Sequence, residues 1–87
     1  MSSTEILMLI ANTAGAYILD DIGTGEIVLK EADGTDMKIT DADGRRLSAR
    51  FPYILVEGLI QQRYVTQDQN DRRIYRISHD SLRAAQS

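Results

Sequence analysis

The sequence predicts a small α+β domain with the order helix, short β-strands, helix and C-terminal β-hairpin. Three observations indicate this class: a capped apolar run near the N-terminus, short β-like runs between glycine-rich turns, and an apolar segment that leads from Pro52 into a polar hairpin. The chain has 87 residues, and a protein of this size buries only about 60–65% of its extended surface. We therefore expect one domain, residues 1–87, whose stability is modest or partly supplied by a partner.

The start of the first helix is indicated by a capping motif. Ser2-Ser3-Thr4-Glu5 has the form of a capping box, in which the Ser2 hydroxyl accepts from the Glu5 amide and the Glu5 side chain reaches back. The run Ile6–Ala11 is apolar on every face of a helix, which indicates burial from several sides. Polar and glycine residues from Asn12 to Gly15 then weaken the helix and end it.

Short β-strands are expected after this helix because the pattern changes to brief apolar runs separated by turn residues. Glycine pairs or Asp-Gly occur at residues 23–25 and 33–34, and Asp41-Ala42-Asp43-Gly44 is a further turn. Residues 45–50 are expected to form a helical turn after it. The predicted strands are Tyr17–Leu19, Glu26–Lys30 and Met37–Thr40.

The second half contains the main helix and the terminal hairpin. Pro52 favours the first position of a helix, so we expect the helix to run from Pro52 to about Gln62, with Leu55, Val56 and Leu59 in the core. The hairpin arms are predicted at residues 64–66 and 73–77. On the second arm, alternation places Tyr75 on the inward face.

Charge is divided unevenly between the two halves of the chain. Residues 1–44 hold nine acidic residues against Lys30 and Lys38, a balance of −7, whereas residues 45–87 hold eight arginines against four acidic residues, a balance of +4. Arginine suits phosphate and carboxylate groups, so the basic half indicates a binding surface. A second interpretation is that the basic half neutralises the acidic half within the fold.

The stretch from the main helix to the hairpin carries a resemblance to a known family. Leu55, Leu59 and Ile60 on the helix lead through Arg63-Tyr64-Val65 to the polar tip Asp68-Gln69-Asn70-Asp71, and the basic segment Arg73–Ser78 returns. This pattern of residue types, over about a third of the chain, resembles the end of a winged-helix DNA-binding domain. The resemblance implies a winged-helix-like domain and a DNA-binding transcriptional regulator.

Double-stranded DNA is therefore the expected partner, contacted through arginines on the hairpin and ahead of the main helix. The main helix has a narrow polar strip that includes Glu57 and Gln61, so we expect contact with phosphates rather than base-specific readout. About six contacts would make the binding strongly dependent on salt. The predicted DNA-binding residues are Arg45, Arg46, Arg50, Arg72, Arg73 and Arg76.

No catalytic, metal or cofactor site is expected. Ser78-His79-Asp80-Ser81 contains triad residue types, but neighbours in sequence cannot converge on one reacting atom, and Asp80 or Ser81 better suits the cap of a helical turn at 82–85. Calcium-loop frames centred on Gly34 and Gly44 place wrong residues at the ligand positions. The absence of cysteine excludes thiolate ligands and a cysteine nucleophile.

A protein-interaction module is the alternative function, acting as a small phage or mobile-element inhibitor or as a regulatory subunit. Its partner would meet apolar helix faces and an acidic surface, which agrees with the net charge of −3. The apolar first helix also predicts a homodimer in which Leu7, Met8 or Ile10 touches its symmetry mate. Ile6–Ala11 is too short to span a bilayer, so we expect a cytoplasmic protein with no membrane partner.

Overall fold

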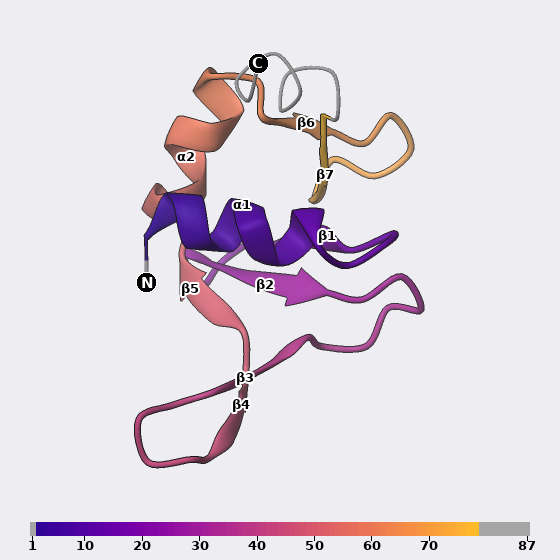
Figure 1. Ribbon diagram of the computed structural model, residues 1–87. Coiled ribbons are helices and arrows are strands. Elements are labelled where there is room, and N and C mark those ends of the chain that lie inside the picture. The colour runs from indigo at the N-terminus through magenta and orange to yellow at the C-terminus, as the bar shows by residue number, and fades with distance from the viewer. Residues whose placement is uncertain (1, 79–87) are drawn as a thin grey trace, which may run out of the picture.

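The computed structural model describes residues 2–78, and it is an α+β domain with two helices and antiparallel sheets (Figure 1). The expected order of helix, strands, helix and hairpin is confirmed. The helices are α1 (Ser3–Ala11) and α2 (Ile54–Gln61). The strands are β1 (Tyr17–Asp21), β2 (Glu26–Lys30), β3 (Lys38–Thr40), β4 (Arg46–Ser48), β5 (Arg50–Pro52), β6 (Val65–Gln67) and β7 (Ile74–Ile77).

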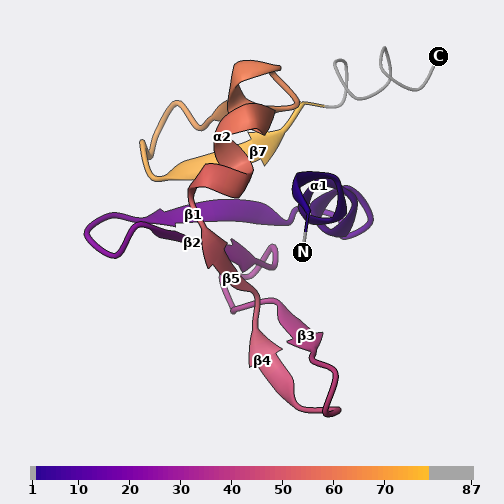
Figure 2. The ribbon, with the colours of Figure 1, turned by 90° about the vertical axis from the view of Figure 1, so that its left-hand side faces the viewer.

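Five strands form one sheet in the order β5-β2-β1-β7-β6, and each neighbouring pair is antiparallel. The hairpin β6–β7 joins this sheet because β7 pairs with β1, with Ile18 opposite Tyr75. Strands β3 and β4 form a separate two-stranded hairpin, residues 38–48, here called the arm. The arm projects from the body of the molecule in both views (Figures 1 and 2).

The core lies between the two helices and one face of the large sheet. Register places Ile18, Leu29 and Tyr75 side by side on that face, and all three belong to the same buried cluster as residues of both helices. Val56 and Leu59 of α2 are buried, which confirms their predicted place in the core, whereas Leu55 is half-buried. The two helices are also joined by the Ser3 hydroxyl, which donates to the Leu55 carbonyl.

Helix α1 begins and ends as its sequence predicts. The Ser2 hydroxyl accepts from the Glu5 amide at 3.2 Å, the Glu5 carboxylate accepts from the Ser2 amide, and the cap at the other end is Asn12. The large sheet and α2 cover one side of α1, so Leu7 and Ile10 of this helix are buried within the chain. Of the three residues predicted to touch a symmetry mate, Met8 is therefore the exposed one, and the homodimer stays a prediction.

Two predictions about the segment before α2 are wrong. Residues 45–50 form strands rather than a helical turn, because the turn that ends at Gly44 (φ 83°) reverses the chain and pairs Leu47 with Ile39 across the arm. Pro52 ends β5 opposite Glu26 instead of starting the helix. It sits on an edge strand, where the missing amide proton costs no sheet hydrogen bond, and α2 begins at Ile54.

Two further expectations concern other parts of the chain. No helix among residues 2–78 is long and apolar enough to cross a membrane. The helical turn expected at 82–85, its cap at Asp80 or Ser81, and His79 all lie outside the residues that the structure describes.

Candidate functional site

The hairpin arginines are paired with the carboxylates of their own hairpin. Arg73 Nη2 lies 3.3 Å from Asp71 Oδ2, and Arg76 Nε lies 2.8 Å from Asp68 Oδ2. The hydrogen bond from Arg76 is the main cause that lowers the pKa of Asp68, and the one from Arg73 is the main cause that lowers the pKa of Asp71. Arg76 also lies over the ring of Tyr17, 5.0 Å from its centre. Arg73 and Arg76, both predicted to contact DNA, are therefore paired with carboxylates of the hairpin itself.

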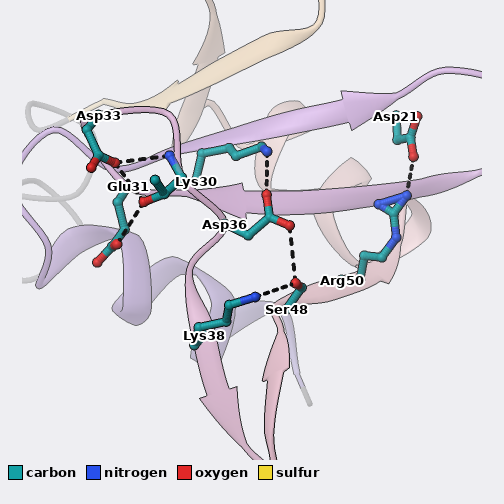
Figure 3. A network of polar contacts seen from close by, with 9 residues as sticks. Asp21, Lys30, Glu31, Asp33, Asp36, Lys38, Ser48 and Arg50 are labelled. Atoms are coloured by element: carbon teal, nitrogen blue, oxygen red, sulfur yellow. Dashed lines mark hydrogen bonds and ion pairs between the residues drawn. The ribbon is translucent and has the colours of Figure 1, made fainter.

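Arg50 is also held by carboxylates, and these come from the acidic half of the chain. Its guanidinium donates to Asp21 (Figure 3), and its Nε lies 3.7 Å from Glu26 Oε1. The register explains this contact, because β5 pairs with β2 and β2 pairs Glu26 with Asp21. Arg50 therefore neutralises part of the acidic half, as the second interpretation of the charges predicts, and is not free for phosphate.

Arg45, Arg46 and Arg72 are exposed and form no ion pair within residues 2–78. They lie in different places: Arg45 and Arg46 are on the arm, and Arg72 is on the turn between β6 and β7. These two hairpins point away from each other in both views (Figures 1 and 2). The structure therefore does not bring the six predicted arginines together on one face.

A polar network fixes the base of the arm to the large sheet. The Lys30 ammonium donates to Asp36, whose other oxygen accepts from the Ser48 hydroxyl at 3.1 Å, and Ser48 in turn accepts from Lys38 at 3.0 Å (Figure 3). The hydrogen bond from Lys30 is the first cause, and that from Ser48 the second, that lowers the pKa of Asp36. A two-stranded hairpin is marginal alone, so these contacts help to hold the arm in place.

Metal-ligating side chains do not gather into a cluster in the described part of the chain. No group of three or more His, Cys, Asp or Glu residues within residues 2–78 could hold a metal ion. The segment 78–81, with triad residue types, lies almost wholly outside that part.

The most exposed large apolar side chains lie at one end of the sheet. Ile22, in the turn between β1 and β2, is 70% exposed, and Ile54, the first residue of α2, is 71% exposed. They flank the same turn because the Tyr53 amide donates to the Gly25 carbonyl at 3.0 Å. Figure 2 shows this turn projecting from the sheet beside the start of α2. These are two of the four large apolar side chains that are exposed among the described residues, with Met8 and Leu47.

Two carboxylates are close to these isoleucines in the sequence, Asp20 two residues before Ile22 and Glu57 one helical turn after Ile54. Asp20 of β1 and Glu57 of α2 both act on Tyr53: burial is the largest cause that raises the pKa of Tyr53, followed by Tyr75, and the negative charges of Asp20 and Glu57 raise it further. We call the set Asp20, Ile22, Ile54 and Glu57 the acidic end. The sequence analysis missed it, because its members come from two segments that only the fold brings together.

A second, smaller apolar surface lies between α1 and the arm. Met8, 43% exposed, lines an open hollow of about 300 Å³ together with Leu9 and with Ile39 of the arm. Met8 is the residue of the predicted dimer contact that remains accessible. Leu47, opposite Ile39 on the arm, is 46% exposed.

No protein-family model, curated protein or solved structure matches this chain. The functional argument therefore rests on the residues and geometry of the chain itself.

Proposed function

We propose that this domain is a protein-interaction module that docks on its partner through the acidic end. The single observation that supports the proposal is the pairing of Ile22 and Ile54, each about 70% exposed, around one turn. Burying an exposed isoleucine side chain stabilises a complex by about 1.5–3 kcal/mol. Two such side chains, Ile22 in the turn between β1 and β2 and Ile54 at the start of α2, form an anchor of the kind that dominates protein interfaces.

The acidic end also has the support that a docking site needs. Ile54 is held at the start of α2, whose Val56 and Leu59 are in the core, and Tyr53 ties that start to Gly25. Ile54 therefore requires little ordering when a partner binds, which lowers the entropic cost of association.

The test is site-specific photo-crosslinking of the full chain in the cells that express it. A photoreactive amino acid at position 22 or 54 should capture the same protein, whereas the same group at position 47, on the arm, should not. The captured protein, once purified, should bind the wild type and lose at least about tenfold in affinity for Ile54→Ser. Equal binding to Ile54→Ser with an unchanged melting temperature would show that the acidic end is not the docking site.

A second candidate function is binding of duplex DNA through phosphates, as a winged-helix-like regulator. One observation favours it: Arg45, Arg46 and Arg72 are exposed and have no ion pair in residues 2–78. Three contacts rather than six support weaker, sequence-independent binding. The pairing of Arg50, Arg73 and Arg76 with carboxylates makes it the less favoured candidate.

A further inference from the structure

The carboxylates of the acidic end differ from most others in the chain in having no partner. Within residues 2–78, every other acidic side chain accepts a hydrogen bond or forms an ion pair, with the single exception of Asp43 at the tip of the arm. Asp20, two residues before Ile22, and Glu57, one helical turn after Ile54, therefore carry negative charges that form no ion pair within residues 2–78. The raised pKa of Tyr53, to which both carboxylates contribute, agrees with these charges.

We infer that the acidic end takes a short protein segment in which basic side chains flank an apolar anchor, an inference that rests on the proposed function. An apolar side chain of the partner segment would pack against the exposed isoleucines, and lysine or arginine side chains of that segment would pair with Asp20 and Glu57. Complementary charge around an apolar centre speeds association and excludes acidic competitors. The same negative charge repels the phosphates of nucleic acid from the acidic end.

The arm of a second copy is a poorer match than a separate basic segment. Its exposed Leu47 is apolar, but the arm carries acidic residues at its tip, Asp41 and Asp43, beside its arginines. The β6–β7 hairpin carries no comparably exposed large apolar residue among those described, and two of its arginines are already paired. Within residues 2–78, neither hairpin therefore matches this site as well as a separate basic segment does.

The test uses three synthetic helical peptides of equal length. The first is amphipathic and built from lysine and leucine, the second replaces every lysine with glutamate, and the third replaces every leucine with serine. Binding to the full chain is followed by isotope-edited NMR and by titration calorimetry at two salt concentrations. The lysine–leucine peptide should shift resonances of Ile22, Ile54 and Glu57, and the other two should bind at least about tenfold more weakly.

Variants with matched controls locate the contact on the protein. Ile54→Ser should weaken the lysine–leucine peptide about tenfold or more, and Leu47→Ser, an equivalent change on the arm, should not. Asp20→Asn with Glu57→Gln should weaken it several-fold and flatten its salt dependence, since exposed ion pairs contribute little each but are screened by salt. Asp43→Asn, which removes the third unpartnered carboxylate, is the control for charge.

Each remaining outcome overturns the inference in a recognisable way. If the glutamate–leucine peptide binds at Ile54 as tightly as the lysine–leucine peptide does, the site has no charge preference. The inferred basic segment is then wrong, and the proposed protein-docking function is kept. If the same resonances shift on concentrating the protein without peptide, the occupant is a second copy. If no peptide reaches Ile54 while photo-crosslinking at that position still captures a partner, the partner has other chemistry. If crosslinking also fails, the proposed function fails with it.

Discussion

Truncation of Leu59 to alanine tests whether α2 holds the domain together. Leu59 is 5% exposed and belongs to the cluster that joins both helices to the sheet. Removing a buried leucine side chain costs about 2–5 kcal/mol through lost transfer energy and the cavity left behind. Because the core of a small domain relaxes more easily, we expect about 2–4 kcal/mol. A chain of 87 residues has a total stability of about 4–13 kcal/mol, so this is a large share.

The assay is thermal and urea unfolding followed by circular dichroism. In a domain of this size each kcal/mol shifts the melting temperature by about 4–8 °C, so Leu59→Ala should lower it by at least about 8 °C. Ile54→Ala is the matched control, because it truncates a residue of similar size on the same helix that is 71% exposed. The control should change the stability by less than about 0.5 kcal/mol. Equal melting of Leu59→Ala and the wild type would refute the account of the core, as would equal losses in the two variants.

Two further predictions follow from the charged residues. For the second candidate function, a labelled DNA duplex should bind the protein at low salt, and absence of binding would remove this candidate. Replacing Arg45 and Arg46 together by alanine should reduce the slope of log affinity against log salt concentration by about 1.8. Replacing Arg73 and Arg76, which are paired with carboxylates, should reduce that slope less. For Asp68, the hydrogen bond from Arg76 holds the pKa of the carboxyl below its ordinary value of about 4. The ionised Asp68 therefore stabilises the fold fully above a pH of about 4. This contribution is lost as the pH falls through the lowered folded-state pKa of Asp68. Urea midpoints should therefore fall with pH below about 4 in the wild type and fall less steeply in Asp68→Asn, and identical pH profiles would show that the pair does not act on stability.

The fold could be predicted from local signals where those signals were strong. The capping box at Ser2 fixed the start of α1, and glycine turns separated β1 from β2 as expected. The segment before α2 could not be predicted in this way, because three-residue strands leave almost no periodic pattern. The pairing of Leu47 with Ile39 decided its structure, and that pairing is a tertiary contact.

The candidate site was harder to predict than the fold, for a physical reason. Ile22 and Ile54 stand more than thirty residues apart in the printed sequence, and each is unremarkable alone: one follows a strand, and the other lies in an apolar run that a helical wheel assigns to the core. Their exposure follows from their positions in the fold, Ile22 in the turn after β1 and Ile54 at the start of α2. One signal was present, since an isoleucine between Asp21 and Gly23 in a turn has no neighbour in sequence to bury it.

The arginines show why a count of charges along the chain does not give a binding surface. Arginine and aspartate placed two residues apart on a hairpin, as at Asp71 and Arg73, meet without any cost in chain entropy beyond the turn itself, so they neutralise each other. Arg50 reaches the acidic half because strand pairing brings it there. The charges available to a partner are those that form no ion pair within a hairpin or across paired strands. At the acidic end those charges are negative and accompany exposed isoleucines, and this combination, rather than the number of arginines, favours a protein partner over DNA.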